Sequence, residues 1–222
     1  MQLASILKEK IIIPKDNLIL TIALTGNIGS GKTEAAKIFS QLGAKVYYAD
    51  SIAKELMVSN APVKKLIQTG FGKESYLPDG SLNRSHLADA VFSDAKKREQ
   101  LNSIVHPAVT KELKKIIEKE RRAGKCNLLI VEAALIYEAG IEEMFDYVIV
   151  VRADESRCIE RIEKRDKASR GEILNRMKAQ MDSKKKEAKA DFVIDNSGDI
   201  EALREKCRFI YTLMHNVSQH ST

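Results

Sequence analysis

The stretch GNIGSGKT, residues 26–33, combines three glycines, a lysine and a threonine in the spacing G-x-x-x-x-G-K-[ST]. Because glycines lack β-carbons, the backbone can curl until consecutive N–H groups point at phosphate oxygens, and a following helix adds its partial positive charge. Lys32 would reach the β- and γ-phosphates, and the Thr33 hydroxyl would coordinate Mg²⁺. The stretch therefore predicts a site for a nucleoside triphosphate with Mg²⁺, and the alternative is an ordinary glycine-rich turn. The predicted nucleotide-binding residues of this segment are Gly29, Ser30, Gly31, Lys32, Thr33 and Glu34.

Two carboxylates follow other predicted strands. Asp50 ends the strand AKVYYAD (44–50), at the carboxyl edge where ligands bind in open α/β sheets. There it would align an acceptor hydroxyl and take its proton, and its alternative role is the N-cap of a helix beginning at Ser51. Glu132 follows the apolar run LLIV. Its carboxylate would bind Mg²⁺ through a bridging water and not directly.

Three arginines recur every fourth residue, so they share one face of a predicted helix: Arg157, Arg161 and Arg165. Guanidiniums directed inward would neutralise a phosphoryl group during its transfer, an effect worth about 10³–10⁵ in rate. The alternative is a solvated face with surface ion pairs. Those pairs would be Glu160 with Lys164 and Arg161 with Asp166. The later run Lys184–Lys186 is predicted to be a solvated face.

The hydrophobic pattern predicts an α/β fold, with a five-stranded parallel sheet and helices on both faces. The predicted strands cover residues 18–24, 44–50, 126–137, 145–151 and 190–195. A mostly helical insertion separates the second strand from the third. Pro62 and Pro107 are each predicted at the first position of a helix. The helical pattern of residues 85–122 is interrupted near Ser93-Asp94 and again near His106, which predicts three helices. The charged region 156–189 is predicted to be helical with a break near residues 169–171.

The composition is that of a globular protein with one substantial core: 222 residues, of which 44% are hydrophobic and 31% charged. No apolar run approaches the length of about 20 residues that crosses a bilayer. Charges at Lys8, Glu9 and Lys10 interrupt the N-terminal segment, so we expect no signal peptide. The three cysteines are far apart and are expected to be reduced thiols in a cytoplasmic protein.

The net charge of +6 lies in one segment, residues 156–189, which contains twelve Lys and Arg against six Asp and Glu. A single basic flap favours a small, highly charged ligand over a nucleic acid, although the basic balance leaves a nucleic-acid-binding P-loop ATPase as an alternative. No N-K-x-D stretch of a regulatory GTPase is present. The order of segments favours a small-molecule kinase whose flap excludes water from the reaction. A nucleoside or nucleotide kinase and a P-loop protein that binds without turnover also remain open.

From Ile22 to about Leu213 the chain resembles the dephospho-CoA kinase family, a P-loop kinase fold. The resemblance is in the ordered segments ALTGNIGSGKT, VYYAD, DGSLNRSHLADAVFSD, LNSIVHPAV, RCIERIEKRD and DFVIDNSGD. It implies ATP-dependent phosphorylation of the ribose 3′-hydroxyl of dephospho-CoA, which gives CoA and ADP in the last step of coenzyme A biosynthesis. It also implies a small-molecule substrate, no nucleic-acid or membrane partner, and a monomer or small homo-oligomer.

The resemblance implies roles for individual residues and segments. Asp50, Lys32, Arg161 and Arg165 would be catalytic. Asn196 and Gly198 would lie near the adenine of ATP, and Arg84 and His106 would bind the substrate with Asp50. A lone histidine before a proline is otherwise expected to cap or pack a helix. The implied divisions are a nucleotide-binding core (18–60, 125–155 and 190–222), a CoA-binding helical insertion (61–124) and a lid (156–189). The N-terminal extension (1–17) is extra to the family, and we expect a short accessory strand in it at Ile11–Ile13.

Two departures from the family's usual pattern stand out. Asn27 occupies a position where a third early glycine is common. After the third strand the family usually reads Asp-x-Pro-Leu-Leu-x-Glu, whereas residues 132–138 of this chain read EAALIYE. Glutamate is one methylene longer than aspartate, and a loop without proline is freer. The second departure therefore concerns the metal and the acceptor more than nucleotide binding.

Overall fold

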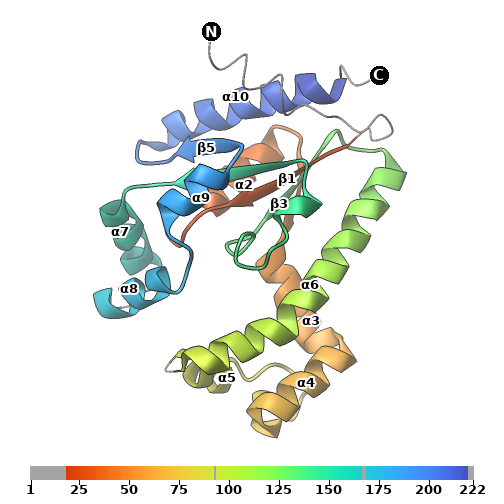
Figure 1. The fold of residues 1–222 in the computed structure, drawn as a ribbon, viewed down its shortest axis with the longest axis vertical. Helices are drawn as coiled ribbons and strands as arrows, with labels where there is room; N and C mark the ends of the chain where they lie inside the picture. Colours follow the sequence, from red (N-terminus) through yellow and green to blue (C-terminus); the bar gives the residue numbers. More distant parts are fainter. Residues whose placement is uncertain (1–18, 93, 167–168, 220–222) are drawn as a thin grey trace.

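The computed structural model describes residues 19–92, 94–166 and 169–219, except for the side chain of Phe92. The predicted extension 1–17 and the accessory strand at Ile11–Ile13 lie outside these residues. A parallel sheet forms the centre of the described chain (Figure 1). Its strands lie in the order β2-β3-β1-β4-β5, and every pairing is parallel. They are β1 (Leu20–Thr25), β2 (Lys45–Tyr48), β3 (Leu128–Glu132), β4 (Tyr147–Arg152) and β5 (Phe192–Asp195). This confirms the predicted five-stranded α/β fold.

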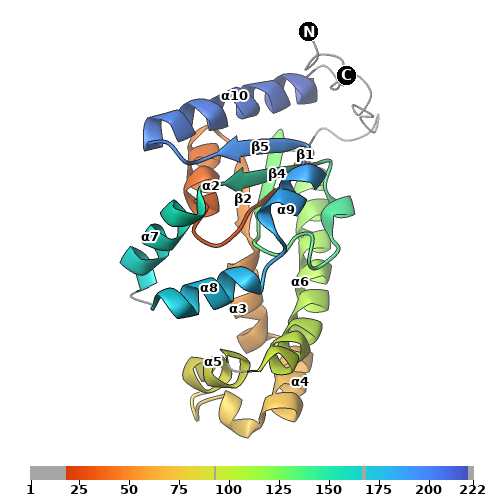
Figure 2. The same ribbon diagram turned by 60° about the vertical axis from the view of Figure 1, so that its left-hand side comes forward.

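The three central strands, β1, β3 and β4, are apolar on both sides because helices cover both faces of the sheet. Alternate residues of β3 divide between two cores: Leu128 and Ile130 face one, and Leu129 and Val131 face the other. On the first face lie α2 (Lys32–Gln41) and α10 (Ile200–Gln219), and α10 runs alongside β5 (Figures 1 and 2). On the second face lie the first turn of α3 (Ala49–Ser59) and the C-terminal half of α6 (Ala95–Ala123).

The insertion between β2 and β3 forms a helical arm that extends away from the sheet (Figure 1). It contains α3, α4 (Ala61–Phe71), the short 3₁₀ helix η1 (Lys73–Ser75), α5 (Arg84–Phe92) and α6. A core of its own holds the arm together: Val63, Ile67, Phe71, Tyr76 and Leu87 are buried against one another. Pro62 is the second residue of its helix, one position later than predicted, in the first turn, where the Asn60 side chain accepts a hydrogen bond from the N–H of Val63 at 3.2 Å.

The prediction that Pro107 begins a helix is wrong. Pro107 lies inside α6, which runs without interruption from Ala95 to Ala123, so residues 84–123 form two helices and not three. A proline removes one intrahelical hydrogen bond and normally bends or breaks a helix. Here Val105, Val109 and Leu113 continue one buried stripe across the proline, and this packing stabilises the helix on both sides of it. Figure 1 shows α6 bending along its length, as expected for a helix with an internal proline.

The basic segment after β4 folds into α7 (Glu155–Asp166), α8 (Arg170–Lys178) and α9 (Ser183–Lys189), with α8 facing the helical arm (Figure 2). The predicted break is confirmed, because α8 begins at Arg170 behind a capping box formed by Ser169 and Glu172. A second break, after α8, was not predicted. There Asp182 caps α9 by accepting a hydrogen bond from the N–H of Lys185 at 3.2 Å. A further 3₁₀ turn, η2 (Glu142–Met144), precedes β4.

Candidate active site

The glycines of the 26–33 loop are required by close approach and by backbone conformation. Gly26, Gly29 and Gly31 have φ angles of 148°, 81° and 94°, a region that side chains with a β-carbon rarely adopt. A β-carbon at Gly26 would collide with the carbonyl oxygen of Val151, and one at Gly31 would collide with the amide of Asn196. The loop is therefore packed against β4 and against the end of β5, and no larger residue fits at these positions.

Several N–H groups of this loop are left to bind a ligand. In the described part of the chain, no hydrogen bond uses the N–H of Gly29, Gly31, Lys32 or Thr33. By contrast, the N–H of Ile28 donates to Oε1 of Gln180 at 2.8 Å. The first two residues of α2 are among the donors, so the helix adds its positive end to the same place. Such a set of donors fits phosphate oxygens.

Lys32 lies at the centre of the charged groups. Burial lowers the pKa of its ammonium, while the nearby carboxylates of Glu132 and Asp50 act in the opposite direction. The positive charges of Lys186 and Arg165 lower the pKa further. The structure thus brings together Lys32, Asp50, Glu132 and Arg165, all of them predicted site residues, and adds Lys186, which was not predicted.

Asp50 does not end a strand. β2 stops at Tyr48, and Asp50 is the second residue of α3, with its side chain exposed. The helix begins at Ala49 behind Tyr48, so the alternative interpretation of Asp50 as the N-cap of a helix from Ser51 is wrong. The carboxylate is held in the first turn of a helix, at the carboxyl edge of the sheet.

Glu132 is the last residue of β3, where it pairs with Leu24 of β1 and Tyr48 of β2. Only 7% of its surface is exposed, and burial raises the pKa of its carboxyl, as does the charge of Asp50, while Lys32 lowers it. Thr33 is exposed in the first turn of α2. Among the described residues no group of three or more His, Cys, Asp or Glu could hold a metal by itself. The donors present fit Mg²⁺, which typically uses one or two carboxylates together with substrate phosphates and waters.

The predicted row of arginines contacts the protein in three different ways. Arg161 supports the loop: its guanidinium donates to the carbonyls of Gly29 and Ser30, each at 3.4 Å, and of Asn196 at 3.0 Å. Arg157 donates to the carbonyl of Gly198 at 3.3 Å. Asn196 is buried, and its amide donates to the carbonyl of Ser30 at 2.8 Å. Asn196 therefore lies beside the loop, and Gly198 lies beside Arg157.

Arg165 is bonded to Asp166, at 2.7 and 3.0 Å, and Asp166 also binds Arg176 at 3.0 Å. The alternative prediction, a solvated helix face with surface ion pairs, is thus partly right. Glu160 and Lys164 do pair, at 2.7 Å, but the partners of Asp166 are Arg165 and Arg176 and not Arg161. Arg165 keeps a side chain that is 63% exposed, close enough to Lys32 for their charges to interact.

Two adjoining cavities lie next to Asp50. One, of about 220 Å³, is bordered by α3, α6 and the loop after β3, and is mostly apolar. The other, of about 620 Å³, opens between the helical arm, Ile28 of the glycine loop, and α8. Both are lined by Asp50, Asn102, His106, Ala134 and Leu135. Arg84, predicted to bind the substrate, is exposed at the start of α5 and lines neither cavity.

His106 is half-buried in α6, where burial lowers the pKa of its imidazole and the negative charge of Glu138 opposes that shift. Sequence reasoning missed Asn102, Glu138 and Gln180 near the cavities. Their residue types are common in helices and loops, and only the long-range packing of α6, α8 and the loop after β3 brings them together.

The prediction that Lys184–Lys186 is a solvated face is wrong at its last residue. Lys186 has no exposed surface. Its Nζ lies 2.8 Å from Oε1 of Glu138 and 2.9 Å from the carbonyl oxygen of Ala134, to which it donates. A seven-residue helix has too few residues for a hydrophobic pattern to show which side is buried, so this contact could not be predicted.

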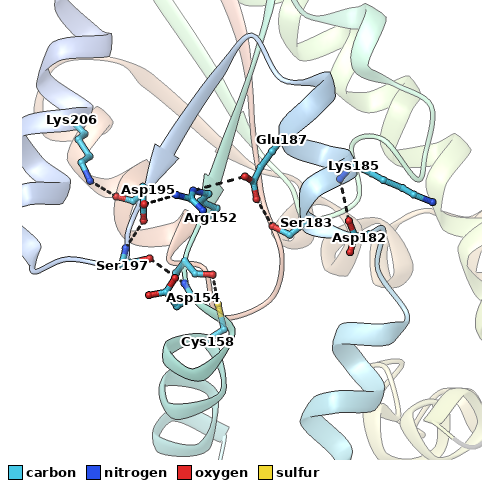
Figure 3. A network of polar contacts seen from close by, with 11 residues as sticks. Arg152, Asp154, Cys158, Asp182, Ser183, Lys185, Glu187, Asp195, Ser197 and Lys206 are labelled. Atoms are coloured by element: carbon cyan, nitrogen blue, oxygen red, sulfur yellow. Dashed lines mark hydrogen bonds and ion pairs between the residues drawn. The ribbon is translucent and has the colours of Figure 1, made fainter.

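A separate polar network joins the ends of β4 and β5 to α9 and α10 (Figure 3). Arg152 at the end of β4 binds Asp195 of β5 at 2.7 Å and lies 3.8 Å from Glu187 of α9. Glu187 in turn accepts a hydrogen bond from Ser183 at 2.8 Å, and Lys206 donates to the carbonyl of Asp195 at 2.6 Å. Of these contacts, the one between Arg152 and Glu187 attaches α9 to the end of β4.

A glycine loop with unused N–H donors at the carboxyl edge of a parallel sheet, beside carboxylates and an acceptor-sized cavity, defines a P-loop kinase of small molecules. The comparisons with known proteins narrow the class. The dephospho-CoA kinase family model matches residues 20–202. The dephospho-CoA kinase of Salinibacter ruber is 41% identical over 192 residues, which cover 86% of this chain and 96% of the relative.

Solved structures agree. A Thermus thermophilus protein matches with a TM-score of 0.73 and 28% identity, over 88% of this chain and 97% of that one. A dephospho-CoA kinase from Campylobacter jejuni matches with a TM-score of 0.66 and 26% identity, again over 88% and 97%. The chain belongs to the dephospho-CoA kinase family, and the predicted resemblance is confirmed. As a member it is an ATP-using phosphotransferase with a small-molecule substrate. No helix within the described residues is long and apolar enough to span a membrane.

Proposed function

We propose that this chain transfers the γ-phosphoryl group of ATP to the ribose 3′-hydroxyl of dephospho-CoA, giving CoA and ADP. The observation that supports this most directly is the position of Asp50. Its carboxylate interacts with the ammonium of Lys32 on one side and lines both cavities on the other. An alcohol held in these cavities would meet the carboxylate and the terminal phosphate of ATP together.

The proposed chemistry is mainly positioning and electrostatics, because phosphoryl transfer passes through a loose transition state that needs little covalent help. The acceptor hydroxyl donates its hydrogen bond to Asp50, which takes the proton as the new O–P bond forms and the bond to ADP breaks. Lys32 and the N–H groups of the glycine loop stabilise the β- and γ-phosphates. Arg165 is available to leave Asp166 and meet the transferring group, while Arg161 keeps the loop in place and adds its charge.

Mg²⁺ belongs to the same proposal. It would bind the hydroxyl of Thr33 and, through a water, the carboxylate of Glu132, and it would neutralise charge on the β- and γ-phosphates. The raised pKa of Glu132 reflects burial, and a cation near it would favour the ionised carboxylate. Lys32 already supplies part of that positive charge.

On the substrate side, His106 and Asn102 are placed to contact the acceptor from α6, and Asp50 contacts its hydroxyl. Arg84 stays in the proposal only as a residue that would have to approach the acceptor from the exposed start of α5. Asn196 and Gly198 would border the adenine of ATP. We further propose a cytoplasmic location, with reduced thiols at Cys126, Cys158 and Cys207. A monomer or small homo-oligomer that binds no nucleic acid completes the proposal.

The test is a comparison of acceptors. ADP release is measured with ATP and Mg²⁺ in the presence of dephospho-CoA, AMP, UMP or a nucleoside, with Asp50→Asn as the matched inactive control. We expect dephospho-CoA to give the highest kcat/KM. Equal or faster turnover of a nucleotide would refute the assignment and favour a nucleotide kinase. Normal ATP affinity with no ADP release for any acceptor would indicate a binding protein, and tight, salt-dependent binding to DNA or RNA would indicate a nucleic-acid ATPase.

A further inference from the structure

Lys186 is buried, whereas the two lysines before it in the sequence are exposed. Lys184 and Lys185 are exposed on the same short helix, whereas the ammonium of Lys186 is enclosed between Glu138 and the carbonyl of Ala134. An ion pair removed from water often adds little net stability compared with apolar side chains of the same volume. The role of the Lys186–Glu138 pair is therefore better sought in the segments that it holds in place than in the stability of the fold.

What Lys186 holds is the loop that borders the acceptor cavities. Ala134 lies two residues after Glu132 and lines both cavities, and Leu135 beside it does the same. Ala134 has no ring to restrict its backbone, so its orientation depends on the hydrogen bond from Lys186 at 2.9 Å and a longer one from the Thr25 hydroxyl at 3.4 Å. Fixing this loop fixes one wall of the space opposite Asp50.

Glu138 extends the same connection to the phosphate side. The oxygen that faces Lys186 also accepts a hydrogen bond from the N–H of Met181 at 2.8 Å. The carbonyl of Met181 accepts one from the side chain of Asn27 at 3.2 Å, and Gln180 accepts one from the N–H of Ile28 at 2.8 Å. The segment between α8 and α9 therefore links the glycine loop to the loop after β3.

We propose that Lys186, paired with Glu138, is a positioning residue for the acceptor: it holds the loop after β3 against the lid and sets where the acceptor hydroxyl lies relative to Asp50. This inference rests on the proposed function and deepens its acceptor side. Arg152 of β4 lies 3.8 Å from Glu187 of α9 (Figure 3), and this second attachment limits the freedom of the helix that carries Lys186.

The experiment compares Lys186→Met with Lys185→Met, a matched control one residue away, whose side chain extends away from the network in Figure 3. For Lys186→Met we expect kcat/KM for dephospho-CoA to fall about 10–100-fold, because a small displacement of a reacting group has effects of that size. Affinity for a non-hydrolysable ATP analogue should fall less than kcat/KM, because Lys186 bonds directly to the loop after β3 and acts on Lys32 only through its charge. Lys185→Met should match the wild type. Unchanged kcat/KM in Lys186→Met, or an equal loss for ATP-analogue binding, would overturn the inference.

A second variant separates positioning from stability. Glu138→Gln combined with Lys186→Met removes both charges while keeping an acceptor for the N–H of Met181, so no buried charge is left unpaired. We expect its melting temperature to return toward that of the wild type while kcat/KM for dephospho-CoA stays low. Recovery of both quantities, or loss of the fold in both variants, would show that the pair serves stability alone. If the wild type prefers AMP to dephospho-CoA, the proposed function fails, and the same comparison with AMP still tests Lys186.

Discussion

The two sides of the candidate site are built in opposite ways. The phosphate side comes from consecutive residues, 26–33, whose N–H groups and Lys32 follow directly from one strand and begin one helix. The acceptor side is assembled from α3, α6, the loop after β3 and α9, through Asp50, His106, Ala134 and Lys186. Phosphate can be bound by backbone groups and charge, whereas an acceptor hydroxyl needs side chains in a defined space. Variants that affect only one side show whether this division is real.

The largest expected effect is on the acceptor side. Asp50→Asn should lower kcat about 10²–10⁴-fold, because the amide cannot take the hydroxyl proton. The affinity for an ATP analogue should change little. Steady-state kinetics with dephospho-CoA and a binding titration measure the two quantities. Glu55→Gln, at an exposed position of the same helix, should behave like the wild type. Full turnover by Asp50→Asn would remove the carboxylate from the mechanism.

On the phosphate side, Lys32→Ala should lower kcat/KM for ATP about 10²–10³-fold, the cost of losing one charge-stabilising donor in an enclosed site. Binding of dephospho-CoA, followed without ATP by calorimetry, should stay close to that of the wild type. The matched control is Lys37→Met, an exposed residue on the same helix that pairs with Glu34. If Lys32→Ala weakened both ligands equally, the two sides would not be separable.

Gly31→Ala tests the loop itself. At φ 94° and against the Asn196 amide, a β-carbon should lower the free energy of unfolding by about 1–3 kcal/mol and weaken ATP binding as the loop moves. Gly171→Ala in α8 is the control, because nothing lies within 4 Å of a β-carbon there, and it should be neutral or slightly stabilising. Urea unfolding checks both. A Gly31→Ala protein as stable as the wild type would contradict the packing described for the loop.

The smallest expected effect is a pH dependence at the boundary between the two sides. The pKa of Glu132 is raised in the folded protein, so its contribution to stability is complete below the ordinary value of 4.5 and is lost as the pH rises through the folded pKa. Relative to the wild type, Glu132→Gln should therefore gain stability between acid and neutral pH. Urea unfolding of both proteins at the two pH values measures it. A wild type that gains stability relative to the variant as the pH rises would reverse the inferred environment.

Much of the fold could be predicted because its patterns are local. β1 is an apolar run between polar residues, and α2 repeats its apolar residues at helical spacing, so neither depends on distant contacts for its identity. Pro107 shows where local reasoning fails: the proline disfavours a helix, but packing of Val105, Val109 and Leu113 against the sheet outweighs that preference. The end of β2 was misplaced by two residues for a similar reason, since α3 begins at once to bury Ala49.

The candidate site divides in the same way. The sequence by itself determined the phosphate loop. The shape of residues 26–33 depends on consecutive backbone dihedral angles, and the only other elements it requires are the strand before the loop and the helix after it. It also placed Glu132 at the carboxyl edge of the sheet, where β3 ends, and Asp50 near the same edge, although Asp50 lies in the first turn of α3 and not at a strand end. Only the tertiary structure decided that Lys186 is buried, that Arg161 supports the loop, and that Arg84 stays outside the cavities. Those outcomes depend on residues more than 40 positions apart coming into contact, and a side chain's surroundings at that distance are set by packing and not by spacing.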